Sequence, residues 1–210
     1  MKKIFGVIIL FMVSVSVKSQ TVAQKQEILY GAIQKADLQK TPFADWFTTG
    51  YDNYQPDPKV NDKLRKLYAK DFSIQIFLGT WCGDSKREVP RLLKLLDETG
   101  FPKKKLRIVA LGGSDSLVKQ RPQHEEAGKG IFRVPTVIVY RNGIEVNRIN
   151  EFPALSLETD LYAILNGQPY IPNYKSFATI RSWLEDSTLL NNNSSVRGLA
   201  SQLRPLTDNE

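Results

Sequence analysis

The single cysteine of this sequence, Cys82, is the side chain best placed to do chemistry. It comes after an apolar run at 72–78 and before a helical pattern, so we expect it between a buried strand and a helix. Backbone N–H groups and the dipole at a helix start favour the thiolate, which is the nucleophilic form of cysteine. Ser85, one turn later, can donate a hydrogen bond to that thiolate. The sequence therefore predicts a sulfur nucleophile at a helix start.

Other residue types that support chemistry are scarce. One cysteine and one histidine exclude an internal disulfide and a four-ligand zinc site of the usual kind, so we expect no metal, and no pattern calls for a cofactor. His124 lies in a polar stretch, 123–127, where a solvated histidine is favoured over a Cys–His nucleophile. Residues 112–114 lack the full glycine pattern of a phosphate-binding loop. The lysine run 103–105 fits a solvated turn better than a partner site.

The elements around Cys82 alternate along a chain of 210 residues whose composition, 41% hydrophobic and 24% charged, is that of a globular protein. Four strands are predicted, at 72–78, 106–111, 134–140 and 144–150, and two helices, at 86–99 and 155–165. The second helix is expected to be capped by Ser156 and ended by Gly167. The polar segment 114–130 is expected to form a loop with a helix. Connections between the first three strands are long enough for parallel pairing, whereas Asn142-Gly143 predicts a hairpin that makes the last pair antiparallel. This order predicts an α/β fold with a central mixed sheet and helices on both faces.

Extensions flank this part of the chain on both sides. Before it, helical spacing covers 24–39 and 60–68, and the aromatic, turn-rich stretch 43–57 is interpreted as packing against the main domain rather than as a ligand groove. After it, helical candidates lie at 177–186 and 196–203. We divide the chain into 1–19 as a signal peptide, 20–70 as an N-terminal helical and aromatic extension, 71–168 as the main domain and 169–210 as a C-terminal tail.

The first residues have the pattern of a secretory signal. Lys2 and Lys3 precede a mostly apolar run at 4–17 that is too short to span a bilayer, and 17–19 offers a small-residue cleavage site. We expect an exported protein of the bacterial periplasm or cell envelope, with no stable membrane insertion after cleavage. Much of the net charge of +7 belongs to this segment. No basic tract interleaved with aromatic residues remains, so nucleic-acid binding is not expected.

The motif Trp81-Cys82-Gly83-Asp84-Ser85 resembles the W-C-G-P-C active site of thioredoxins, with serine in place of the second cysteine. Pro90 stands where that family has its helix-kinking proline. Val134-Pro135-Thr136, followed by a strand and Asn142-Gly143, matches the family's cis-proline strand and hairpin. The resemblance covers about 72–167, and the combination of distant motifs makes it specific. The lead-in to the motif looks like that of exported thioredoxin-like proteins of bacteria.

The resemblance implies a thioredoxin-like fold and a role for each matching residue. Cys82 would be the attacking thiol, and Trp81 would cover one side of the site. Pro135, in cis, would lie beside the sulfur, and the carbonyl and amide of Val134 would pair with an extended substrate chain. The predicted catalytic residues are Cys82 and Ser85, and the predicted substrate-binding residues are Trp81, Gly83, Asp84, Val134 and Pro135.

Departures from the family pattern limit this chemistry. Ser85 replaces the resolving cysteine, the second thiol that would release a mixed disulfide. This chain could therefore form a mixed disulfide, shuffle an existing disulfide as an isomerase does, or be released by an external thiol. Ile76 occupies the position of the buried aspartate that assists proton transfer in thioredoxins, which leaves Asp84 or Glu88 as the candidates to replace it. Asp84 also stands where the family has a proline, and it puts a charge beside the sulfur.

These residues leave two functions open. The first is a thiol–disulfide oxidoreductase or exchange protein of the cell envelope, which forms mixed disulfides through Cys82. Its partners would be protein or small-molecule thiols and disulfides. The alternative is a non-catalytic thioredoxin-fold module that binds a peptide or protein, in which the cysteine serves only as a hydrogen-bonding group. The sequence makes no prediction of oligomeric state.

Overall fold

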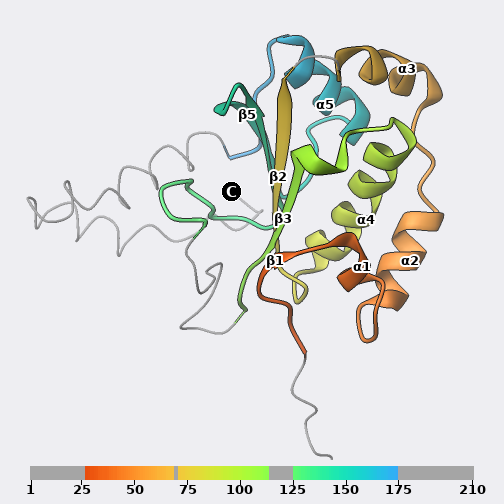
Figure 1. Cartoon of the computed structure of the whole chain (residues 1–210), viewed down its shortest axis with the longest axis vertical. Helices are drawn as coiled ribbons and strands as arrows, with labels where there is room; N and C mark the ends of the chain where they lie inside the picture. The colour runs from red at the N-terminus through yellow and green to blue at the C-terminus, as the bar shows by residue number, and fades with distance from the viewer. Residues whose placement is uncertain (1–26, 69–70, 114–124, 175–210) are drawn as a thin grey trace, which may run out of the picture.

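A computed structural model describes residues 27–68, 71–113 and 125–174 of the chain (Figure 1). The helices are α1 (Lys35–Leu38), α2 (Ala44–Asp52), α3 (Pro58–Leu67), α4 (Gly83–Glu98) and α5 (Leu157–Asn166), with a 3-10 turn, η1 (Lys103–Lys105). The strands are β1 (Gly31–Ile33), β2 (Phe72–Leu78), β3 (Leu106–Ala110), β4 (Thr136–Arg141) and β5 (Ile144–Asn150). The signal segment, His124 and the helices expected at 177–186 and 196–203 lie outside the described residues. Within the described ranges, no helix combines the length and apolar character that a membrane crossing needs.

The five strands form one mixed sheet in the order β1-β3-β2-β4-β5. β2 and β3 are parallel, as expected, with Ile76 opposite Ile108. β4 is antiparallel to β2, so the expected parallel pairing of the third predicted strand is wrong. A long connection permits either direction, and the apolar run of a buried strand does not reveal which one the chain takes. Asn142 and Gly143, with φ of 52° and 79°, close the predicted hairpin between β4 and β5.

Buried side chains alternate along the central strands between the two faces of the sheet. Ile74 and Ile76 pack into the core shared with the helices, and α1–α5 all lie on that side of the sheet (Figure 1). Phe77 belongs to a second apolar cluster on the other face, with Ile131 and Val134 from the segment before β4. The helix expected between 114 and 130 lies largely outside the described residues. The mixed sheet with its helices confirms the α/β class. The described helices cover one face of the sheet, however, and not the two faces that we expected (Figure 1).

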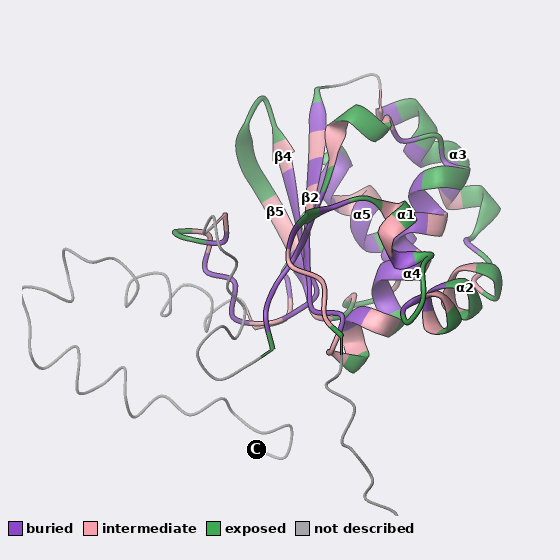
Figure 2. Cartoon of the chain, turned by 60° about the horizontal axis from the view of Figure 1, so that its bottom comes forward, coloured by how far each residue is buried: buried purple, intermediate pink, exposed green. Residues whose placement is uncertain are grey.

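The N-terminal extension differs from the helix expected at 24–39. Gly31–Ile33 form β1 instead, antiparallel to β3, and among the described residues 27–39 only Lys35–Leu38 are α-helical. Gly31 has φ of 79°, outside the helical region, and Ile33 is buried in the same core as the central strands. Pairing with β3 therefore overrides the helical spacing of the apolar residues. At the opposite edge of the sheet, formed by β5, the tip of the β4–β5 hairpin is exposed to solvent (Figure 2).

The aromatic stretch 43–57 contains a helix, α2, where we expected turns. Phe43 and Phe47 are buried, and the rings of Trp46 and Phe47 pack edge to face with centroids 6.1 Å apart. α2 lies against α4, where a Cβ on Gly50 would be 3.1 Å from the Cβ of Pro90. The aromatic residues thus pack against the main domain, as expected.

The two long helices of the main domain are close to their predicted ranges. α4 begins at Gly83 rather than at residue 86, which makes Cys82 the residue immediately before its first turn. α5 begins after Ser156, whose side chain accepts a hydrogen bond from the Thr159 N–H, and it ends at Gly167 in the left-handed conformation. Both ends of α5 therefore follow the predicted capping residues.

Candidate active site

Cys82 lies where the loop after β2 enters α4. Its backbone is extended, with φ −84° and ψ 130°, and its carbonyl accepts a hydrogen bond from the Lys86 N–H at 3.1 Å. Its own N–H donates to the Gly79 carbonyl at 2.9 Å, which closes the loop between strand and helix. The side chain is half-buried. The structure therefore places the sulfur at a helix start, within reach of solvent.

The Cys82 side chain meets the segment that leads into β4. Its thiol donates a hydrogen bond to the Val134 carbonyl oxygen at 3.1 Å. The Val134–Pro135 peptide bond is cis, as the resemblance implies. Val134 belongs to the apolar cluster on the second face of the sheet, and Trp81 and Cys82 pack against that cluster. The structure thus brings the two distant motifs of the sequence together at one end of the sheet.

Ser85 lies in the first turn of α4 and is fully buried. Its hydroxyl oxygen accepts a hydrogen bond from the Gly79 N–H at 3.1 Å. Among the described contacts, no hydrogen bond joins Ser85 to the Cys82 sulfur, whose partner is the Val134 carbonyl. Ser85 therefore holds the loop in place. Donation to a thiolate stays a prediction, since the contact with Gly79 leaves the hydroxyl proton available.

The acidic residues near Cys82 are bound by arginine. Arg87 lies 2.7 Å from Asp84 Oδ1 and 2.6 Å from Glu88 Oε1, and the hydrogen bond with Glu88 raises the pKa of Arg87. Glu88 is buried, as is Ile76, where thioredoxins have their aspartate. In the described structure neither carboxylate hydrogen-bonds to the sulfur, so no acidic residue is assigned to assist it. The remaining predicted residue, Gly83, is exposed.

Gly79 is a site residue that the sequence analysis missed. Its N–H donates to Ser85 and its carbonyl accepts from Cys82, while its Cα lies against the indole of Trp81. The next residue, Thr80, is buried and accepts a hydrogen bond from the Leu29 N–H at 3.2 Å, so the N-terminal extension reaches the same loop. The only signal for Gly79 was a glycine between a strand and the cysteine, which many loops carry.

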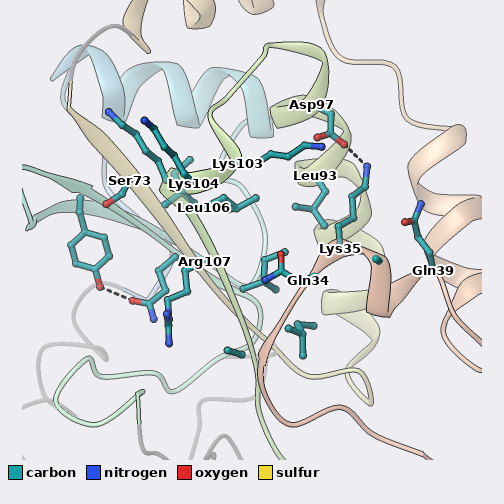
Figure 3. A pocket seen from close by; sticks show the side chains of 18 residues that line it. Gln34, Lys35, Gln39, Ser73, Leu93, Asp97, Lys103, Lys104, Leu106 and Arg107 are labelled. Atoms are coloured by element: carbon teal, nitrogen blue, oxygen red, sulfur yellow. Dashed lines mark hydrogen bonds and ion pairs between the residues drawn. The ribbon is translucent and has the colours of Figure 1, made fainter.

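A cavity of about 620 Å³ lies at the opposite end of the sheet from Cys82, beside the first residues of β2 and β3 (Figure 3). Lys35 and Asp97 form an ion pair of 2.5 Å at its wall. Lys104 and Arg107 point away from each other (Figure 3), so these two cationic groups do not converge on one point. The lysine run forms η1, with Lys103 and Lys104 exposed, which agrees with the solvated turn we expected. The cavity therefore adds nothing to the chemistry of the thiol.

Comparisons with known proteins add a structural likeness alone. No protein-family model and no curated protein matches the chain. Among solved structures, the chain is similar to a mutant thioredoxin from Halobacterium salinarum NRC-1, with 16% identity and a TM-score of 0.30, over 57% of this chain and 91% of that chain. The fold is thioredoxin-like. The strand order of the sheet and the position of the cysteine at the start of α4 carry that assignment.

Among the described residues, no three histidine, cysteine or acidic side chains gather as a metal site.

Proposed function

We propose that this chain is a thiol–disulfide exchange protein that acts through the single sulfur of Cys82. The observation that carries the proposal is the position of this sulfur, half-buried at the start of α4 and 3.1 Å from the Val134 carbonyl. A cysteine with a purely structural role is usually sealed in a core, where it is inert. Cys82 instead borders solvent next to the exposed Gly83.

The exchange step is a displacement at sulfur. The Cys82 thiolate attacks one sulfur of a substrate disulfide, a new S–S bond forms, and the substrate S–S bond breaks. The second substrate sulfur leaves as a thiolate and takes up a proton from water. The number of disulfide bonds does not change in this step. Because Ser85 has no thiol with which to attack the mixed disulfide, an external thiol releases Cys82 by the same displacement.

The hydrogen bond between Cys82 and Val134 links this chemistry to substrate binding. The thiol is the donor, so the bond exists only while the sulfur holds its proton. Ionisation of Cys82 releases the Val134 carbonyl, which is the group that an extended substrate chain would pair with. Pairing with substrate and formation of the thiolate would therefore favour each other.

The proposal includes export to the bacterial periplasm or cell envelope, where disulfides persist. It rests on the signal pattern at 1–19, and the proposed partners are protein or small-molecule thiols and disulfides. The intact mass of the chain recovered from the envelope of an expressing bacterium tests this part. A mass that still includes the first 19 residues would contradict cleavage after Ser19.

Incubation with oxidised glutathione followed by intact-mass measurement tests the exchange chemistry. We expect a single glutathione adduct that forms rapidly near neutral pH and is removed by an added small thiol. The Cys82→Ser variant should form none, because the chain has no other cysteine. A thiol that stays unmodified until strongly alkaline pH would contradict the proposal.

A non-catalytic binding module is the second candidate function. It is favoured by the engagement of Ser85 with Gly79 and of both nearby carboxylates with Arg87, which leaves no described group on the sulfur except the Val134 carbonyl. Such a module would retain its cellular role in a Cys82→Ser variant. A thiol-exchange protein would lose that role.

A further inference from the structure

Two glycines from separate chain segments lie against the indole of Trp81. Gly79 follows β2, and Gly113 follows β3. A Cβ on Gly79 would lie 2.6 Å from Trp81 Cε2, and a Cβ on Gly113 would lie 2.6 Å from Trp81 Cδ1. Packed side chains do not approach this closely, so a methyl group at either position would displace the ring.

The need for glycine at these positions comes from space and not from the backbone. Neither Gly79 nor Gly113 has the positive φ seen at Gly100, Gly143 and Gly167. Alanine could therefore adopt the backbone conformation of either residue. What opposes the substitution is the indole itself, because its ring atoms are the nearest neighbours at both positions.

A hydrogen bond holds the indole in this place. Trp81 Nε1–H donates to the Leu111 carbonyl at 3.1 Å, and the Leu111 N–H in turn donates to Leu78 at 2.8 Å. The acceptor is thus fixed to the ends of β2 and β3. The indole packs with Cys82 against the apolar cluster on the second face of the sheet.

We infer that Gly79 and Gly113 together form a seat for the indole, that is, the surface against which the ring packs. We further infer that the ring in this position determines the solvent accessibility of the Cys82 sulfur. Both glycines are positioning residues, since they act on the sulfur only through Trp81 or the loop. The functional meaning of the seat rests on the proposed thiol chemistry. Gly113 is the cleaner position to test, because Gly79 also hydrogen-bonds to Cys82 and Ser85.

The position of the ring can be followed with fluorotryptophan-labelled protein by ¹⁹F NMR, in which the Trp81 resonance is the one lost in a Trp81→Phe variant. Gly113→Ala should shift this resonance. Gly83→Ala is the matched control for the resonance, because a methyl group there meets nothing within 4 Å. Equal resonances in wild type and Gly113→Ala would overturn the seat.

The accessibility of the Cys82 sulfur can be followed by its rate of alkylation with iodoacetamide, a reaction that needs no disulfide substrate. Gly113→Ala should change this rate at least about threefold, as expected when the loss of one hydrogen bond lets the ring move. In a Trp81→Ala background, Gly113→Ala should have no further effect. The same change in both backgrounds would overturn the inference, because the glycine would then act without the indole.

Two outcomes keep this inference separate from the proposed function. If Gly113→Ala alone does not fold, the added Trp81→Ala change should restore folding, and failure to do so would overturn the seat. A protein whose Cys82 does not exchange with disulfides would contradict the proposed function alone, since alkylation and the ¹⁹F resonance would still report the position of the ring.

Discussion

The Cys82 thiol and the Val134 carbonyl, 52 positions apart in the sequence, are joined by a hydrogen bond of 3.1 Å. The antiparallel pairing of β2 and β4 explains this contact. Phe77, near the end of β2, lies opposite Thr136, the first residue of β4. The loop that follows β2 and the segment that precedes β4 must therefore meet at the same edge of the sheet. The proposed chemistry depends on this meeting point.

Serine and alanine at position 82 should separate the hydrogen bond from the chemistry. Cys82→Ser keeps a donor for the Val134 carbonyl, so its free energy of unfolding should exceed that of Cys82→Ala by about 0.5–1.5 kcal/mol. Urea unfolding measures this difference. Neither variant should form an adduct with oxidised glutathione. An alanine variant as stable as the serine variant would show that the contact does not contribute to folding.

A second thiol in the first turn of α4 should change the fate of the mixed disulfide. In Ser85→Cys, the introduced thiol can attack the glutathione adduct on Cys82, so the adduct should no longer accumulate and an internal disulfide should appear in the intact mass. The Cys82→Ser/Ser85→Cys double variant is the control, because it has no partner for that bond. Persistent adduct in Ser85→Cys would mean that the two side chains do not reach each other.

The contact between Tyr54 and Glu158 should stabilise the docking of the N-terminal extension on α5. The Tyr54 hydroxyl donates to Glu158 Oε1 at 2.7 Å, and the Asp57 N–H donates to the same oxygen at 3.2 Å. Glu158 is buried, so Tyr54→Phe should lower the free energy of unfolding by about 1–3 kcal/mol. Tyr162→Phe is the matched control, because among the described residues the hydrogen bond of its hydroxyl is an exposed 3.4 Å contact with Asn166. Equal losses in the two variants would contradict the assignment.

The free energy of unfolding should fall at alkaline pH because buried tyrosines ionise more readily in the unfolded state than in the folded state. Burial raises the pKa of Tyr68 from 10.0 to about 12. Because the folded state holds this proton more tightly than the unfolded state, the contribution of Tyr68 is fully present below pH 10 and is lost as the pH rises from 10 to 12. Urea unfolding between pH 8 and 12 should give a flatter decline for Tyr68→Phe than for wild type. Parallel curves would contradict the effect of burial.

Local patterns predicted the elements that carry their own signals. The apolar run of β2, the Asn142-Gly143 turn and the Ser156 cap each depend on a few neighbouring residues, and the structure has all of them. The prediction of a helix over 24–39 was wrong because the apolar spacing of this segment also suits a short edge strand. Pairing with β3 decided between the helix and the strand. The prediction that β4 would be parallel to its neighbour was wrong because no local pattern records which strand it will pair with, or in which direction.

For the site, the sequence by itself determined that one sulfur stands at a helix start and that no second thiol can resolve its adducts. The tertiary structure decided what surrounds that sulfur. It placed the Val134 carbonyl on the thiol, turned Ser85 toward Gly79 and seated Trp81 against Gly113. These contacts join residues that are distant along the chain or share a tight loop. They exist only because the packed sheet brings the ends of β2, β3 and β4 to one edge.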